Sequence, residues 1–389
     1  MKKKYIYLIS IGLTFLVLAG NINAGSVDLT YKNNGISFGN SRELNGIRLN
    51  LTDHRVKQVN GINITLWSPR KNKHFHMNGL ALGVIAPSAA RFHGIAFGGI
   101  GIHGGDINGI ALSGIGIGAK DVRGFVCAGL GIGLSDIDGV AISGIGMGAG
   151  NVTGLAISGL GMGIGKIKGV AIAGLGMGTG DGEGLVVAGL GGGYDDFTGV
   201  AVAGLGMGMD NFKGIGIAGL GFGATNFSGI GISGLGMGGN NITGLVIGGL
   251  GVGAESIEGV ALGGIGVGAK NVEGLVISAG MVGGQNINGV SIAGLGIAAR
   301  EQKWLSIAGG LIVGVKIEGV SIAGLGIKGY DLKGLKIAPY CHAKDQMIGV
   351  SISIINIAEN LEGLQIGLLN FAGNNKAPFK LTPLINYHK

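Results

Sequence analysis

Two consecutive stretches of the chain decide its fold: residues 139–153 read GVAISGIGMGAGNVT, and residues 154–168 read GLAISGLGMGIGKIK. Both have 15 residues, begin with Gly and carry similar residue types at equivalent positions. We number the positions of each such coil from 1 to 15, starting at the first Gly. An internal repeat of this kind is typical of architectures in which neighbouring units stack and bury a continuous core.

The repeat covers most of the 389-residue chain. Glycine recurs at position 1 every 15 residues from Gly79 to Gly289, Trp304 then takes the place of one glycine, and the series resumes at Gly319. Two intervals differ, since Gly61 and Gly79 are 18 apart, and Gly349 and Gly363 are 14 apart. The longer interval places three extra residues within residues 68–73, which read SPRKNK, and we expect them to bulge as a dispensable surface loop.

The composition excludes several classes of protein. The chain contains 88 Gly and only 5 Pro, with 46% hydrophobic and 13% charged residues. Disordered chains are polar and charged, and collagen requires Gly at every third position with abundant Pro. Helices spanning this repeat are disfavoured because each interior Gly costs about 1 kcal/mol relative to Ala.

The spacing within a coil predicts three short strands that meet at three corners. Positions 4, 9 and 14 are apolar and five apart, and positions 2 and 7 follow the same interval. Because side chains alternate along a strand, we expect positions 2, 4, 7, 9 and 14 to point inward and positions 3, 5, 6, 8 and 10 to point outward. Ile217 should then be buried and Ala218 exposed. Gly at the corners and Asn or Asp at position 13 are typical of turns. The prediction is an all-β protein, a narrow single-domain β-solenoid with about 15 residues per coil.

A transmembrane β-barrel is the alternative fold. Ten-residue stretches such as 139–148 have the length of a membrane-spanning strand. Against it, the turns all have similar chemistry, the apolar alternation changes between positions 4 and 7, and the chain ends Tyr387-His388-Lys389 without a terminal aromatic residue.

The beginning of the chain predicts export. Lys2, Lys3 and Lys4 precede an apolar run, and the small residue Ala24 suits cleavage, as in a secretory signal peptide. We therefore expect four segments: a signal peptide at 1–24, an N-terminal cap at 25–45, the repeat solenoid at 46–376 and a C-terminal cap at 377–389.

The repeats resemble those of the glycine-rich "surface repeat" families of exported Gram-negative bacterial proteins. The resemblance lies in units such as GLAISGLG at residues 154–161 and in GLQIGLLN at residues 363–370. It implies a location at the cell surface or outer membrane, or outside the cell, and it transfers no functional residue to this chain.

No catalytic, cofactor-binding or metal-binding residues emerge from the sequence. Gly-x-Gly occurs in nearly every coil, so it carries no information about nucleotide binding. His74 and His76, with His54 or His93, and acidic pairs such as Asp136 with Asp138 could in principle hold a metal. The histidines stand beside lysines and the acidic pairs do not recur, so exposed loop and edge residues are the interpretation that we adopt. The two cysteines, Cys127 and Cys341, lie about 14 coils apart, which excludes a disulfide between them in a solenoid.

The expected function follows from the surface. The formal net charge of +7 falls to +4 when three signal-peptide lysines are removed, which does not indicate nucleic acid. The basic excess between Arg48 and Arg91 should form a solvated rim. Charged residues concentrate at positions 11 to 15, whereas the positions assigned outward elsewhere are Ala, Ser and Gly. We therefore expect a structural or adhesive surface protein, without enzyme activity or a small-molecule substrate. It would make lateral contacts through flat Gly/Ala/Ser faces with an envelope component, glycan or copies of itself. An outer-membrane channel or scaffold is the alternative if the chain forms a barrel.

Overall fold

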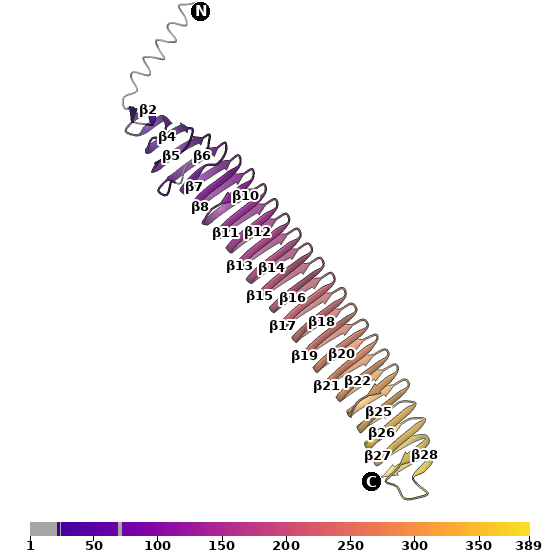
Figure 1. Ribbon diagram of the computed structural model, residues 1–389. Coiled ribbons are helices and arrows are strands. Elements are labelled where there is room, and N and C mark those ends of the chain that lie inside the picture. The colour runs from indigo at the N-terminus through magenta and orange to yellow at the C-terminus, as the bar shows by residue number, and fades with distance from the viewer. Residues whose placement is uncertain (1–21, 24, 69–71) are drawn as a thin grey trace, which may run out of the picture. The chain divides into compact units, whose positions relative to one another are not determined.

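The computed structural model describes residues 22–23, 25–68 and 72–389, and every regular element in them is a β-strand (Figure 1). The predicted signal peptide lies outside the described residues except for Ile22 and Asn23, and residues 69–71 of the predicted bulge lie outside them as well. The described part of the chain contains no helix that could cross a membrane. The chain divides into two compact units, Met1–Gly189 and Leu190–Lys389, which we call unit 1 and unit 2.

Unit 1 begins with a hairpin and continues as stacked coils. Two antiparallel strands, β2 and β3, form the hairpin, and β3 then pairs in parallel with β4. From there each strand pairs in parallel with the strand one coil further on. The strands of unit 1 are β1 (Ile22–Asn23), β2 (Ser26–Tyr31), β3 (Asn34–Gly39), β4 (Glu43–Asn50), β5 (Gln58–Thr65), β6 (His76–Gly83), β7 (Ser88–Gly98), β8 (Gly101–Ser113), β9 (Gly116–Gly118), β10 (Asp121–Ala128), β11 (Gly131–Ser143), β12 (Gly146–Ser158), β13 (Gly161–Ala173) and β14 (Gly176–Ala188).

Unit 2 has the same architecture and ends with an antiparallel strand. The last strand, β28, pairs antiparallel with β27 and occupies the edge that the stack would otherwise leave open. The strands of unit 2 are β15 (Gly191–Ala203), β16 (Gly206–Ala218), β17 (Gly221–Ser233), β18 (Gly236–Gly248), β19 (Gly251–Gly263), β20 (Gly266–Ser278), β21 (Met281–Ala293), β22 (Gly296–Ala308), β23 (Leu311–Val313), β24 (Lys316–Ala323), β25 (Gly326–Ile337), β26 (Tyr340–Ile352), β27 (Ile355–Ala372) and β28 (Leu381–His388).

The register of the strands confirms the β-solenoid. Gly139 pairs with Gly154 in unit 1, and Gly214 pairs with Gly229 in unit 2, so each residue stacks on its equivalent 15 residues later. Neighbouring repeat strands are parallel, which excludes the alternative fold, since that fold requires antiparallel neighbours. Gly61 pairs with Gly79, so the ladder between β5 and β6 bypasses the three extra residues.

Each coil has three straight segments and three corners, as the spacing predicts. One corner is the position 1 glycine, whose φ is positive throughout the stack, for example +124° at Gly154. The second is the bend at positions 6 and 7. The third lies at position 12, where the ladder lacks a pair and two consecutive residues are exposed, as at Ser135 and Asp136.

The glycines of the repeat fall into two groups that differ in what surrounds them. A Cβ on Gly154, at position 1, would lie 2.1 Å from the carbonyl oxygen of Gly139, and one on Gly144, at position 6, would lie 1.9 Å from that of Gly129. These corners cannot hold a larger residue without moving the backbone. By contrast, a Cβ on Gly146 or Gly148, at positions 8 and 10, would have nothing within 4 Å. Stacking therefore requires glycine at positions 1 and 6 but not at positions 8 and 10.

The direction of the side chains corrects part of the sequence prediction. Positions 9 and 14 point inward as expected, and Met147 and Val152 are 4% and 1% exposed. Positions 2, 4 and 7 were predicted inward but point outward, whereas positions 3 and 5 were predicted outward but point inward. Ile217 is 40% exposed and Ala218 is 3% exposed, so both predictions for this pair are wrong.

The narrow interior explains this exchange. Phe197, Phe212 and Phe227, at position 14 of consecutive coils, form the predicted inward stack in unit 2, with neighbouring ring centroids 6.2 and 5.5 Å apart. Phe222, at position 9, meets two of these rings edge-on. A Cβ on Gly216, at position 3 of the same coil, would lie 2.1 Å from the ring of Phe222. Large side chains at positions 9 and 14 thus leave room only for small residues on the facing segment.

The inward and outward assignments can be tested on adjacent residues. Ala218→Asp places an unpaired charge in the core and should destabilise the coil by about 3 kcal/mol or more. Ile217→Asp leaves its charge in water and should cost about 1 kcal/mol or less. Because long repeat arrays need not unfold as one unit, hydrogen exchange of the amides around residue 217 is the measurement. Equal loss of protection in the two variants would contradict the assignment.

The two groups of glycines can be tested in the same way. Gly144→Ala forces the backbone of adjacent coils apart and should destabilise its coil by at least about 2 kcal/mol. Gly148→Ala meets open space and restricts the unfolded chain, so it should stabilise the coil by about 0.5–1 kcal/mol. Hydrogen exchange of residues 140–160 distinguishes these outcomes, and destabilisation by Gly148→Ala would show that position 10 requires glycine.

Candidate functional site

The described residues contain no group of three or more His, Cys, Asp or Glu side chains that could hold a metal ion. His74 and His76 are both exposed, on either side of buried Phe75. The distinctive features of this protein are its surfaces, and three of them follow from the direction of the side chains.

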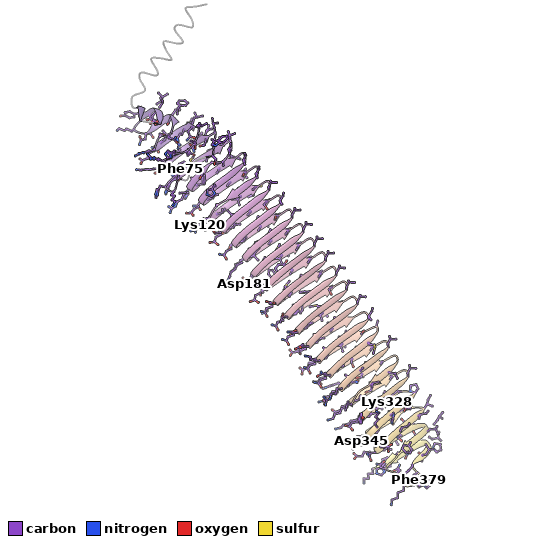
Figure 2. The ribbon with its side chains drawn as sticks, in the orientation of Figure 1. Phe75, Lys120, Asp181, Lys328, Asp345 and Phe379 are labelled. Carbon is purple, nitrogen blue, oxygen red and sulfur yellow. The ribbon has the colours of Figure 1, made fainter. Side chains whose placement is uncertain are left out.

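The polar surface consists of positions 12, 13 and 15. Figure 2 places Lys120 and Asp181, both in unit 1, on the same side of the stack, and the Lys166 ammonium lies 2.9 Å from the Asp181 carboxylate one coil further on. In unit 2, the Asn226 amide donates a hydrogen bond of 2.7 Å to the Asn211 side chain one coil before it. Position 13 was predicted as a turn but lies within a strand, because in-register stacking lets an amide bond to its equivalent in the next coil. This surface satisfies much of its own polarity.

The apolar face consists of the outward rows at positions 2 and 4 and the corner row at position 7. In unit 2, Ile215 and Ile217 are each 40% exposed, and Leu220 is 45% exposed. In unit 1, Ile145 and Leu160 are 46% and 47% exposed. The pattern repeats coil after coil in each unit, and a contiguous exposed apolar surface of this kind marks an interaction site.

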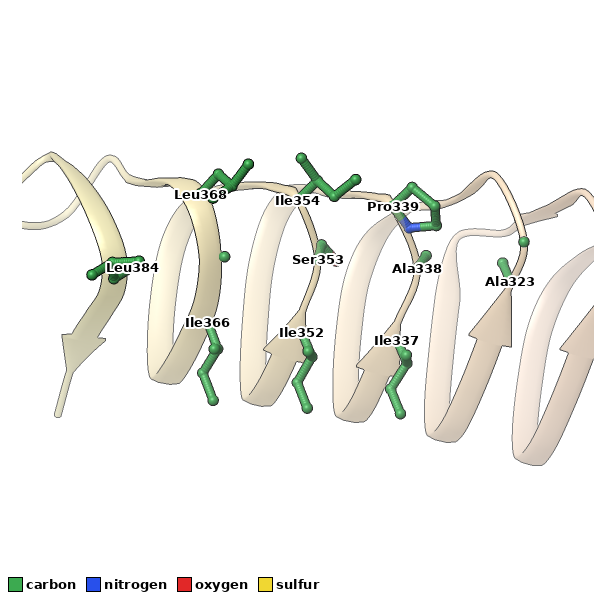
Figure 3. Close-up of a pocket in the computed structure, with 12 residues that line it drawn as sticks. Ala323, Ile337, Ala338, Pro339, Ile352, Ser353, Ile354, Ile366, Leu368 and Leu384 are labelled. Carbon is green, nitrogen blue, oxygen red and sulfur yellow. The ribbon is translucent and has the colours of Figure 1, made fainter.

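A groove runs along this face near the end of unit 2 (Figure 3). Its volume is about 580 Å³, and it lies between the row of Ile337, Ile352 and Ile366 and the corner residues Pro339, Ile354 and Leu368. Because the position 4 row and the corner row line one groove, they border a common surface.

A bare strip lies on the other side of the position 7 corner. It consists of the outward glycines at positions 8 and 10, such as Gly146 and Gly148, around which a Cβ would find open space. The expectation of flat faces without side chains therefore holds for these two positions. It is wrong for positions 3 and 5, because the core takes up their small residues: Ala156, Ala171, Ala201 and Ala203 are at most 3% exposed.

Trp304 interrupts the position 1 series and was noted in the sequence only as a break. It has a φ of +81°, a conformation that bulky residues rarely adopt, and it is 72% exposed. It borders a groove of about 680 Å³ together with Val290, Leu305 and Val320, which belong to the position 2 row. The one bulky residue at position 1 among the 15-residue coils thus stands at the edge of the apolar face.

Polar residues are buried in the first coils of unit 1. Arg48, predicted in a solvated basic rim, is completely buried at position 3 and pairs with buried Asp53. Burial lowers the pKa of Arg48, and the attraction of Asp53 opposes this shift. Asn63 and Thr65 also donate to the Asp53 carboxylate. The sequence contained the signal, since Arg48 occupies position 3, which points inward.

A buried lysine occupies the same position near the end of unit 2. The Lys336 ammonium donates to the carbonyl oxygens of Gly319 and Lys333, each at 3.0 Å, and to the hydroxyl of Ser321 at 3.2 Å. Burial lowers the pKa of Lys336 to about 8 and raises the pKa of the Cys341 thiol to about 12. Cys341 and Cys127 are both free thiols, as the coil spacing predicts. With its bonds filled by the chain itself, Lys336 serves the core rather than a ligand.

Comparison with known proteins identifies no relative. No protein-family model matches this chain, and neither a curated protein nor a solved structure matches it. The surfaces described above are therefore the basis for inferring function.

The buried lysine predicts how the stability of the last coils depends on pH. The pKa of Lys336 is about 8 in the folded chain and 10.5 in its absence, so between these values the unfolded chain binds more protons and stability rises with pH. The gain between pH 8 and pH 9 should be about 1 kcal/mol, and Lys336→Met should abolish it.

Alkylation of buried Cys341 measures this opening, with peptides resolved by mass spectrometry. Each pH is compared between the two proteins, which cancels the ionisation of the thiol itself. Parallel pH profiles for the parent and Lys336→Met would show that Lys336 does not titrate in this range.

Proposed function

We propose that this protein is an exported structural protein of the bacterial cell envelope that acts by lateral contact through its apolar face. The observation that carries the proposal is the outward row of aliphatic residues at positions 2, 4 and 7 in both units. Most exposed apolar residues in proteins are scattered singly, whereas here they recur in register along each stack.

The separation of the surfaces supports this function. Charged side chains gather at positions 12, 13 and 15, so the polar surface keeps the protein hydrated while the apolar face is free of charge at positions 2 and 4. Contact through one coil would be weak, but contacts at successive coils add without new ordering of the chain, as in multivalent binding. A rigid β-surface of this kind suits attachment rather than catalysis, which supports a protein without enzyme activity.

Export is supported by the sequence of residues 1–24, whose basic start and apolar run resemble a secretory signal. A processed chain that begins at Gly25, detected by mass spectrometry of the protein from fractionated cells, is the expected result. A chain that retains Met1 in the soluble cell fraction would contradict export.

The apolar face is tested by adding lysine to three consecutive coils. Ile217→Lys, Ile232→Lys and Ile247→Lys alter outward side chains at position 4 and should leave the fold intact. They should also release the protein from the envelope fraction into the soluble fraction after a high-salt wash, with at least about a tenfold loss of retained protein, because charge on the face must be desolvated on contact.

The matched control places three lysines on the polar surface at Thr198, Ser228 and Thr243, which are exposed at position 15. This control should be retained like the parent, and circular dichroism verifies the fold of both variants. Equal retention of the two triple variants would show that the apolar face is not the attachment surface.

A further inference from the structure

We propose that the apolar face of unit 2 binds the same face of a second copy of this chain, with the two stacks parallel and related by a two-fold axis along the stacking direction. This inference rests on the proposed function, because it assigns a partner to the same surface. It draws on the size of the face, its periodicity and one coil that departs from the repeat at both of its edges.

The face is large enough for a stable dimer. Unit 2 contains twelve coils whose position 1 residue has a positive φ, from Gly199 to Gly363 and including Trp304. With strands ~4.8 Å apart and a four-residue segment ~13 Å long, each coil offers about 60 Å². Twelve coils give roughly 750 Å² per copy and 1,500 Å² in total, which is the size of a standard stable interface.

The chemistry of the face favours another copy over other partners. All residues at positions 2 and 4 of these twelve coils are Val, Ile or Leu, without exception. Such a surface needs a dry, flat and equally apolar partner. A second copy also carries the same spacing of side chains from coil to coil, so its rows fit between those of the first over the whole length, as in packed β-sheets ~10 Å apart. Glycan lacks this apolar character, and a lipid surface lacks the spacing.

Trp304 forms a knob at one edge of the face. It stands beside the position 2 row at 72% exposure, and its positive φ is a strain that Gly in the same place would avoid. The ladder to the next coil lacks the pairs of Lys303 and Trp304, so the side chain stands there at some structural expense. Exposed tryptophan is enriched among residues that dominate protein interfaces.

The same coil has a notch at the opposite edge. Position 7 is Gly310, where the neighbouring coils carry Leu295 and Leu325. Those two leucines are 67% and 63% exposed, compared with 45% for Leu220 in the regular part of the row. The missing side chain therefore opens a gap in the corner row. A second notch at Gly280 has no knob in its own coil, and nothing in the structure explains it.

A two-fold axis along the stack brings the knob and the notch together. This rotation reverses the strand direction across the interface while keeping every coil at its own level, so the position 1 edge of one copy faces the position 7 edge of the other. Trp304 of each copy then meets Gly310 of the other, between two leucines. Such a contact is self-complementary, as a two-fold interface requires, and each dimer contains it twice.

The first test removes the knob. Trp304→Gly restores the residue of the other coils, so thermal stability of the chain should be unchanged or higher, while the Kd of the dimer should rise at least tenfold by analytical ultracentrifugation. Tyr330→Ser is the matched control, because Tyr330 is an exposed aromatic residue of unit 2 at position 12, on the polar surface. It should leave the Kd unchanged. A dimer as tight in Trp304→Gly as in the parent would overturn the assigned contact.

The second test determines the orientation. In a Cys127→Ser background, protein carrying Leu305→Cys is mixed with protein carrying Ile307→Cys. The proposed axis places position 2 of one copy opposite position 4 of the other in the same coil, so oxidation should join 305 to 307 between chains, and much less in either protein alone. Antiparallel stacks would place position 2 opposite position 2 and give no preference for the mixed pair, which would refute the arrangement.

The outcomes for the dimer and for the proposed function are separable. A chain that stays monomeric up to high concentration, yet floats with vesicles of phosphatidylethanolamine and phosphatidylglycerol through the same face, would overturn the second copy and leave lateral contact intact. A dimer that resists the row of lysines at 217, 232 and 247 in the envelope assay would preserve the pairing and remove the proposed attachment.

Discussion

The structure depends on one constraint: fifteen residues must close into a coil that stacks on its neighbour in exact register. Stacking brings each position 1 and position 6 residue against the carbonyl oxygen of its equivalent, at 2.1 Å for a Cβ on Gly154 and 1.9 Å for one on Gly144. Only glycine satisfies both corners. The closed coil is then so narrow that large side chains at positions 9 and 14 fill it, and the facing segment must present Ala, Ser or Gly.

The surface is a consequence of this core. In most proteins the larger aliphatic residues fill the interior, but here positions 3 and 5 have no space for them. The alternation of a strand then places Val, Leu and Ile at positions 2 and 4 on the outside. The small residues that determine the core and the aliphatic residues that determine the apolar face are therefore neighbours on one segment, and neither can be changed to the other's type without affecting both surfaces.

Much of the fold could be predicted from the sequence because its period is visible in the letters. The 15-residue coil, the three corners, the inward Phe197 stack and the free cysteines all follow from spacing. The apolar face could not be placed correctly, since the alternation was carried from position 4 to position 2 as if the larger residues must be buried. The physical reason lies in packing between segments: Gly216 opposite Phe222, a contact within one coil, decides which side of the strand faces in. Arg48 and Lys336 at position 3 made the prediction harder, because both look like surface residues and are buried through bonds to the chain itself.

In a repeat protein the departures from the repeat carry more information than the repeat. A coil that obeys every rule states only what stacking requires, whereas Trp304 departs from the backbone rule at position 1 and Gly310 departs from the apolar pattern at position 7 of the same coil. Stacking alone requires neither change. Glycine at position 1 would relax the backbone, and leucine at position 7 would complete the corner row, as in the adjacent coils. When one coil gives up both regular residues at opposite edges of an apolar face, the simplest physical account is a contact that reads both edges at once, and that contact must come from outside the coil.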